Sequence, residues 1–341
     1  MIHSKLIKAL SLGAVLITSS LVKAEPLALN QVIDYALTHE PWLQANKYQQ
    51  QAIEAQSIAA GTLPDPVLTV GLMNLPTDGF AFDQEGMTQF KVGLSQQFSR
   101  GDSLALQQQA LQQSAEQYPW LRADRQAQVK AIVSEAWLNA YRAQKSIQLI
   151  NQDKALFNQL IDITEDITAN TLGATRQQDI IRPQLELTRL EDKLAMLEQQ
   201  FDSAKKRLAQ WLPIDMFNGA VSDERTKVTA LMPYQELAPS GVTEVLMGHP
   251  AIIAIEHALR AKNTQVQVAK EAYKPQFGMN LGYGHRDDTP MGDSRADSFP
   301  IGVRVDLQLF TDNRQAQHVN AAIARAGPVK TTKLINLQKL T

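Results

Sequence analysis

Residues 187–211 read LTRLEDKLAMLEQQFDSAKKRLAQW. Apolar or small side chains recur in this stretch at alternating steps of three and four: Leu187, Leu190, Leu194, Leu197, Phe201, Ala204, Leu208 and Trp211. A heptad pattern of this kind keeps facing a partner helix when the two helices supercoil. The stretch therefore predicts one arm of a coiled coil.

The partner arm precedes it in the chain. Its apolar or small residues are mostly three or four apart: Val129, Val133, Ala136, Ala140, Ala143, Ile147, Ile150, Phe157, Leu160 and Ile167. A helix from about Ser103 to Asn170 would measure roughly 100 Å at ~1.5 Å per residue. The two arms predict a long helical hairpin over residues 101–211, and nothing in a globular core needs helices of that length.

The turn of the hairpin falls at Leu172, Gly173, Ala174 and Thr175. Gly173 suits the left-handed conformation that ends many helices, and Thr175 can cap the next helix. Pro183 follows inside the second arm, where a proline removes a backbone donor. We therefore expect that arm to kink or fray until about Leu187.

Composition agrees with long helices. The 341 residues are 44% hydrophobic, 20% charged and 6% aromatic, with no cysteine and a formal net charge of −2. This charge gives no electrostatic reason to expect a nucleic-acid partner. Lys5 and Lys8 precede an apolar run, which predicts a secretory signal peptide over 1–24; an uncleaved anchor is the alternative. No later stretch is apolar enough for a transmembrane helix.

The segments outside the hairpin follow a repeated order. Residues 28–60 show helical periodicity interrupted at Glu40–Pro41, which fits either two helices or one kinked helix. Two strands with a roomy loop fit residues 67–98. Pro41 and Pro66 have the same spacing as Pro250 and Pro275. A second strand pair fits residues 276–284 and 301–310. We therefore predict a first repeat over 25–240, including a connector after the hairpin, and an incomplete second repeat over 241–341.

The strands have the length that crosses a bilayer when tilted, about 9–11 residues, and aromatic side chains lie near their ends. Those aromatic residues are Phe80, Phe82, Phe98, Tyr283, Phe299 and Phe310. A soluble sheet of two hairpins is the alternative. Because open sheet edges are not tolerated in lipid, a membrane-spanning sheet of four strands requires several chains to share one barrel.

Together these features resemble the TolC-type outer-membrane efflux proteins over about residues 27–326. The resemblance lies in the signal peptide, the repeat and several short motifs. These motifs are Leu63-Pro64-Asp65-Pro66-Val67-Leu68, Asn74-Leu75-Pro76, Gly93-Leu94-Ser95-Gln96-Gln97-Phe98, Gly173, Gln178-Asp179-Ile180-Ile181-Arg182 and Glu186-Leu187-Thr188-Arg189-Leu190-Glu191-Asp192. The Pro-Asp-Pro and Asn-Leu-Pro motifs resemble members that serve heavy-metal and cation efflux pumps more than drug-pump members.

The resemblance implies a mainly α-helical chain with a small β part. Each chain of a homotrimer would give four transmembrane strands to one barrel in the outer-membrane lipid, continued by a barrel of coiled-coil hairpins in the periplasm. The protein would be a passive duct without cofactors. Its tip, Leu172, Gly173, Ala174 and Thr175, would dock on a periplasmic adaptor (membrane fusion) protein tied to an inner-membrane RND-type pump.

Three features depart from the family's pattern. Pro183 stands where a good helix former is usual, and the cysteine that is acylated in the lipid-anchored branch is absent. After Phe310 the helical pattern lasts only to about Ala326, before Gly327–Pro328. We therefore expect most of the second long hairpin to be missing, in a truncated or frameshifted product or a fragment. Its assembly should be poor and its transport weak.

Two other classes of function were weighed. An enzyme is not expected, because the six histidines lack metal-ligand spacing and no phosphate loop or nucleophile elbow is present. The acidic residues Asp287, Asp288, Asp293 and Asp297 fit a solvated loop better than a cation site. A periplasmic adaptor or other coiled-coil protein remains the alternative, although an adaptor should flank its hairpin with a lipoyl-like fold and small β-domains.

Overall fold

The computed structural model describes residues 26–170, 177–213, 221–222 and 239–340. These residues are mainly helical, with one four-stranded sheet. They form two compact units: residues up to 38 with 131–227, and residues 39–130 with 228–341. Helix α4 (Gln117–Asn170) contributes residues to both units. The signal peptide expected over 1–24 lies outside the described residues, and the division into two repeats stays a prediction.

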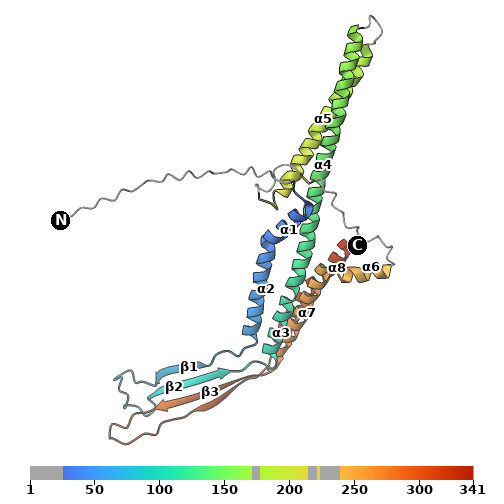
Figure 1. Ribbon diagram of the computed structural model, residues 1–341. Coiled ribbons are helices and arrows are strands. Elements are labelled where there is room, and N and C mark those ends of the chain that lie inside the picture. Colours follow the sequence, from blue (N-terminus) through green and yellow to red (C-terminus); the bar gives the residue numbers. More distant parts are fainter. Residues whose placement is uncertain (1–25, 171–176, 214–220, 223–238, 341) are drawn as a thin grey trace, which may run out of the picture. The chain divides into compact units, whose positions relative to one another are not determined.

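The first unit contains the coiled-coil hairpin. Helix α5 (Gln177–Leu208) runs beside α4 (Figure 1). The expected seam of α5 is its least exposed side, and Leu197, Ala204 and Leu208 are buried there. Small residues on α4, including Ala136, Ala140 and Ala143, are buried as well, which lets two backbones approach closely. The predicted heptad seam is therefore confirmed where both arms are described.

An anchor of two short segments lies against α4 in the same unit. Leu27 and Val221 form a parallel β-bridge, and Ser222 N donates to Leu27 O at 3.2 Å. The buried Trp137 indole donates from Nε1 to Leu27 O at 2.9 Å. Gln144 bonds both backbone groups of Val221, at 2.8 and 3.0 Å. Two α4 side chains thus satisfy the backbone of a minimal two-stranded element.

The rising arm of the hairpin is not one helix. Helix α3 (Ser103–Ala115) ends before Glu116, and α4 begins at Gln117. Pro119 explains this break, because a proline has no N–H to donate to the preceding turn but is tolerated in the first turn of a new helix. The expectation of one continuous helix from 103 to 170 is therefore wrong at this point.

The helices of the second unit pack in the order α2, α3, α7, α8. They are preceded by α1 (Leu29–His39) of the first unit, and α2 and α7 span Pro41–Ala60 and Pro250–Lys270. A short helix, α6 (Pro239–Met247), precedes α7, and a 3-10 turn (Glu271–Tyr273) follows it. Both α2 and α7 start with a proline at the first position, as the repeated sequence predicts.

Two arginines of α4 hold α2. Arg125 Nη2 lies 2.6 Å from Oε1 of Glu40, a residue only 8% exposed, and Arg122 Nη1 donates to Asn46 Oδ1 at 2.8 Å. Asn46 is 2% exposed. Because a buried carboxylate is costly without a partner, these bonds fix the position of α2 against the start of α4.

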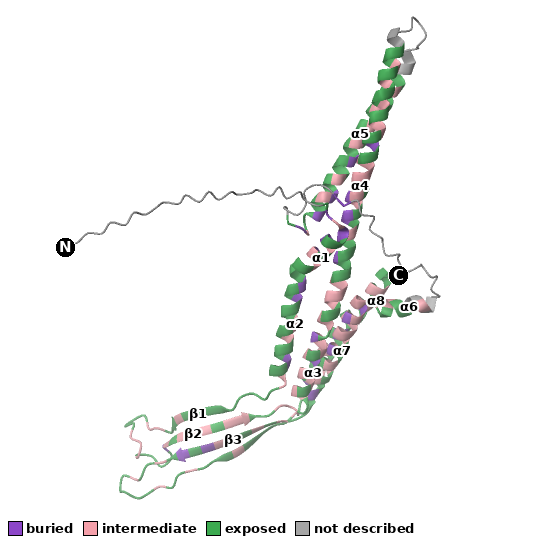
Figure 2. Ribbon diagram, in the orientation of Figure 1, coloured by how far each residue is buried: buried purple, intermediate pink, exposed green. Residues whose placement is uncertain are grey.

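Helix α8, labelled in Figure 2, spans Gln315–Leu340. It therefore includes Gly327 and Pro328. The expected break there is wrong. Packing on α7 explains the difference: Ala326 is buried before the proline, and Lys333 pairs with Glu256 of α7 at 2.7 Å after it. Thr332 Oγ1 also donates to Pro328 O at 2.9 Å. Tertiary contacts on both sides of the proline outweigh its local penalty.

Helix α5 likewise continues through Pro183. It begins at Gln177, so the expected fraying up to Leu187 is wrong, while the kink stays a prediction. Neither internal proline, Pro183 or Pro328, interrupts its helix.

The sheet has four antiparallel strands in the order β1-β2-β3-β4. Their bounds are Val67–Met73, Gln89–Gln97, Gln276–His285 and Ile301–Asp306. The last strand is shorter than the expected 301–310. Its final pair is Asp306 with Gln276, and Pro275 before Gln276 has no N–H with which to extend the ladder.

Candidate functional site: the two faces of the sheet

The sheet has one apolar and one polar face. Cα partners such as Val70↔Val92, Val92↔Tyr283 and Met279↔Val303 place alternate residues of all four strands on a common side. The apolar side carries Leu68, Val70, Leu72, Phe90, Val92, Leu94, Phe277, Met279, Leu281, Tyr283, Ile301, Val303 and Val305. Gln96 and His285 are its polar members.

None of the described residues covers this apolar face. Val303 is 71% exposed, Leu68 is 64% exposed and Ile301 is 63% exposed. A patch of this size in contact with water would be unfavourable, and such patches mark contact with lipid or another protein. Of the aromatic residues expected near the strand ends, Phe80, Phe299 and Phe310 are largely exposed too. The alternation and the exposed aromatic residues together are the pattern of an outer-membrane strand.

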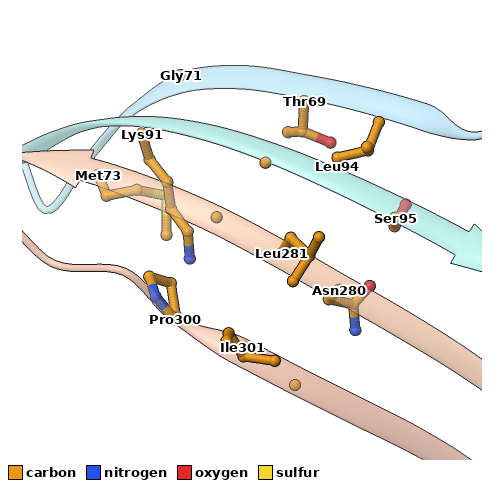
Figure 3. Close-up of a pocket in the computed structure, with 13 residues that line it drawn as sticks. Thr69, Gly71, Met73, Lys91, Leu94, Ser95, Asn280, Leu281, Pro300 and Ile301 are labelled. Atoms are coloured by element: carbon orange, nitrogen blue, oxygen red, sulfur yellow. The ribbon is translucent and has the colours of Figure 1, made fainter.

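The opposite face is polar and glycine-rich. All six glycines of the strands lie on it: Gly71, Gly93, Gly278, Gly282, Gly284 and Gly302. The remaining positions include Thr69, Lys91, Ser95, Asn280 and Arg304. A groove of about 430 Å³ lies along this face, with Lys91 across it (Figure 3). Polar side chains with little volume are what the inside of a water-filled barrel requires.

A junction of charged residues connects the sheet to its helices. Arg100, just after β2, pairs with Asp306 at the end of β4 and donates from Nη1 to Lys274 O at 3.0 Å. Glu271 Oε2 accepts from Asp102 N at 2.9 Å and lies 2.7 Å from Lys274 Nζ. The nearby carboxylates of Glu271 and Asp102 raise the pKa of Lys274. Residues from both predicted repeats thus meet at this junction.

Gly101 is required at this junction. Its φ is +44°, and a Cβ there would lie 2.2 Å from both Glu271 Oε2 and Lys274 Cδ. We expect Gly101→Ala to lower the free energy of unfolding by about 1–3 kcal/mol through backbone strain alone. The added methyl group should also displace the Glu271–Lys274 pair. The midpoint of thermal unfolding in detergent would measure this effect.

Gly292→Ala is the matched control for this substitution. Gly292 also has a positive φ, +88°, but a Cβ there would meet nothing within 4 Å. The control should therefore show strain without the clash. Equal loss of stability in the two variants would contradict the role given to the Glu271–Lys274 contacts.

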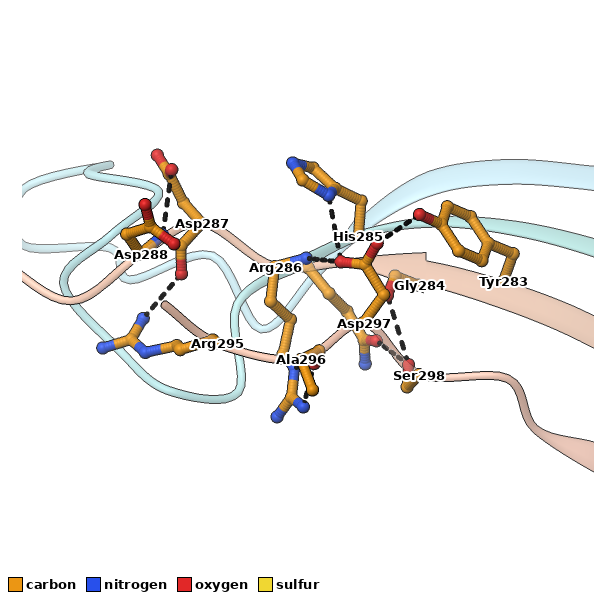
Figure 4. A network of polar contacts seen from close by, with 11 residues as sticks. Tyr283, Gly284, His285, Arg286, Asp287, Asp288, Arg295, Ala296, Asp297 and Ser298 are labelled. Atoms are coloured by element: carbon orange, nitrogen blue, oxygen red, sulfur yellow. Dashed lines mark hydrogen bonds and ion pairs between the residues drawn. The ribbon is translucent and has the colours of Figure 1, made fainter. Parts of the chain in front are cut away.

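At the other end of the sheet, Asp297 joins the loop 286–300 to β3 (Figure 4). Its carboxylate accepts from the Tyr283 hydroxyl, from Arg286 N at 3.3 Å, and lies 3.0 Å from His285 Nδ1. Arg295 reaches the loop between β1 and β2, where its Nη1 donates to Asp83 O at 3.2 Å. These contacts hold the two loops together at this end.

The acidic loop residues have different roles. Asp287 Oδ1 accepts from Asp288 N at 3.0 Å, and Asp293 N donates to Thr289 Oγ1 at 2.9 Å, so two of them form local turns. Across the described residues, no group of three or more histidine or acidic side chains is arranged to hold a metal ion. The helices of the same part of the chain include none long and apolar enough to cross a membrane.

The loop contacts of Asp297 give a pH prediction. The hydrogen bond from Tyr283, with those from Arg286 N and His285, lowers the pKa of Asp297 below 3.8. A lowered folded-state pKa means that these contacts favour the ordered loop above about pH 3.8 and lose this contribution as the pH falls further. The protection factors of the amides in residues 286–300, which correct for the intrinsic pH dependence of exchange, should stay constant from pH 7 to about pH 4 and fall below it.

Asp297→Asn should make this exchange faster already at neutral pH. Asp288→Asn serves as its control, because Asp288 contributes a backbone N–H and not its carboxylate to the network. Exchange in Asp297→Asn that matches the unchanged protein at pH 7 would contradict the assignment.

The tip residues expected to dock a partner, Leu172, Gly173, Ala174 and Thr175, lie outside the described residues, so their role stays a prediction. The structure adds a feature that the sequence analysis missed. Part of α4 and α5 near the turn carries exposed apolar side chains: Leu149, Leu156, Leu160, Ile163, Ile167, Ile181, Leu185 and Met196. Leu149, Leu156 and Ile163 follow a heptad spacing, which could have revealed a second seam.

Leu160 and Ile167 were expected in the buried stripe, and this is wrong: they are 47% and 52% exposed. A straight helix drifts relative to a seven-residue repeat, so a stripe that spans many turns passes from one side of the helix to another. The exposed second seam is the sort of surface that further helices cover.

Comparisons with known proteins agree with this geometry. Protein CyaE of Bordetella pertussis is 24% identical over 316 residues, which are 89% of this chain and 65% of CyaE. The chain thus spans less than two thirds of that relative. No family model matches. The solved CusC structure, described as forming a transmembrane channel, superposes with a TM-score of 0.70 at 16% identity, covering 91% of this chain and 72% of CusC.

A second solved structure is similar to the same extent. The CmeC outer membrane channel of Campylobacter jejuni gives a TM-score of 0.66 at 15% identity and covers 91% of this chain and 68% of CmeC. The chain has the fold of the TolC-type outer-membrane efflux proteins.

Proposed function

We propose that this chain is the outer-membrane channel component of a tripartite efflux system, a passive exit duct for substrates delivered by an inner-membrane pump. One observation carries the proposal: an uncovered sheet with an apolar and a glycine-rich polar face, in a chain with the TolC-type fold. Lipid would cover the apolar face, and the polar face would line a water-filled path. This role needs no catalytic group and no cofactor.

The open edges of the sheet support an assembly of several chains. Strands β1 and β4 are its two edges, and unpaired backbone groups at an edge are not tolerated in lipid. Closing the ladder with further copies, a homotrimer in this proposal, satisfies both edges. The exposed second seam of α4 and α5 would then pack against helices of the same assembly.

The partners follow from the same role. The hairpin turn at Leu172–Thr175 would dock on a periplasmic adaptor, and an RND-type pump would supply the energy. A periplasmic adaptor remains the second candidate. The sheet argues against it, because a soluble adaptor would have no use for a largely apolar, exposed face.

Detergent extraction from isolated outer membranes tests the proposal. The proposal requires that the extracted protein cross-link as a trimer in mild detergent and conduct ions after insertion into planar bilayers. This result would overturn the poor assembly and weak transport expected from the missing second hairpin. Protein that stays in the periplasmic fraction as a monomer, without conductance, would instead support an adaptor or an inactive remnant.

A further inference from the structure

Charge is unevenly distributed on the polar face of the sheet. Three ionisable side chains lie on it within the strands: Lys91, Arg304 and Asp306. Asp306 is neutralised by its ion pair with Arg100 at the junction. Lys91 and Arg304 form no ion pair or hydrogen bond with any described residue. The strands therefore present positive charge to whatever passes along this face.

Arg304 is the less isolated of the two cations. It lines a groove together with Asp65 and Asp306, near the junction with the helices. Carboxylates thus offset part of its field. Lys91 lies farther from the junction, opposite Gly71 and Gly284 in the register, and has no carboxylate among the residues of its groove.

The surroundings of Lys91 leave its ammonium accessible. Thr69, Met73, Ser95, Asn280 and Pro300 share its groove, with glycines between them. A methyl group added at Gly282 would lie 3.5 Å from Lys91 Cε and 3.0 Å from Pro300 Cγ, so the lysine stem passes within van der Waals contact of the Gly282 position. Figure 3 shows this side chain running from β2 across β3.

We propose that Lys91 is a charge-selectivity residue that makes the channel interior prefer anions. The inference rests on the proposed function: each chain of a shared barrel would contribute one Lys91, and rings of lysine or arginine select anions in pores. A low-dielectric wall strengthens the field of such a ring. The polar face therefore argues against a path built for cations, which the Pro-Asp-Pro and Asn-Leu-Pro motifs had indicated.

Reversal potentials in planar bilayers under a KCl gradient test the inference. The unchanged protein should be more permeable to chloride than to potassium. Lys91→Arg should keep this preference, Lys91→Gln should lower the chloride-to-potassium permeability ratio by roughly threefold, and Lys91→Glu should invert it. Lys47→Glu, the same charge change on an exposed position of α2, should have a smaller effect.

The outcomes separate the two proposals. Conductance with the same reversal potential in Lys91→Glu as in the unchanged protein would overturn the role of Lys91 and leave the channel function standing. Absence of any conductance from the unchanged, trimeric protein would overturn both. Cross-linking of each variant to a trimer shows that a changed potential does not come from failed assembly.

Discussion

Met279→Arg is expected to prevent assembly in the outer membrane. Met279 lies near the middle of β3 on the apolar face and is 40% exposed, paired with Gln96 and Val303. An arginine that faces lipid near the bilayer midplane costs about 2–4 kcal/mol per site. In a trimer this cost is met three times, so the trimer band after cross-linking of outer-membrane extracts should disappear.

The neighbouring residue is the matched control for this experiment. Asn280 is adjacent in the same strand but lies on the polar face, opposite Ser95 and Gly302. Asn280→Arg should therefore assemble almost as well as the unchanged protein. If the two arginine variants assembled equally well, the assignment of the faces to lipid and water would be wrong.

Trp137→Ala should cause the largest loss of stability among substitutions in the hairpin unit. Trp137 is 1% exposed, stacks on Tyr141 with ring centroids 5.4 Å apart, and bonds Leu27 O. Truncating a buried tryptophan costs about 3–5 kcal/mol. The urea midpoint of the far-ultraviolet circular dichroism signal should fall accordingly, and the bridge between Leu27 and Val221 should be lost.

Two further variants separate packing from hydrogen bonding. Trp137→Phe keeps most of the buried area but removes the indole N–H. Its free energy of unfolding should fall by only about 1 kcal/mol beyond the loss that the smaller side-chain volume causes. Trp120→Ala changes a tryptophan of α4 that is 37% exposed and should shift the midpoint little. A similar shift in Trp120→Ala and Trp137→Ala would contradict the anchor described for Trp137.

Periodicity predicts those features of this chain that rest on residue spacing. The seam from Leu187 to Leu208, the break before Pro41 and the alternation in β2 follow from where apolar residues fall, and the structure confirms them. The predicted fourth strand is too long, because the alternation of side chains continues to Leu309. Its partner β3 has no residue before Gln276 that pairs with the positions after Asp306. The alternation within one strand does not reveal the length of the strand that pairs with it.

Local breakers were the main source of error. Pro328 lies inside α8 because α7 supplies Glu256 as a partner for Lys333, and this contact joins segments far apart in sequence. Pro119 lies in the first turn of α4, whereas the apolar pattern of this arm begins only at Val129, so the pattern holds no information about the break before Gln117. The loop contacts of Asp297 and Arg295 also join distant positions, so spacing along the chain could not reveal them.

The placement of the strand glycines decides which way the sheet can roll. Six positions on the polar surface are glycines, so the backbone can bend toward that side with less steric conflict. Bending the other way would crowd the phenylalanine, methionine and branched side chains of the apolar surface. Each protomer therefore has a preferred direction of sheet curvature before it meets another protomer. A barrel closed with the apolar surface inside is opposed by the bulk of those side chains as well as by solvation.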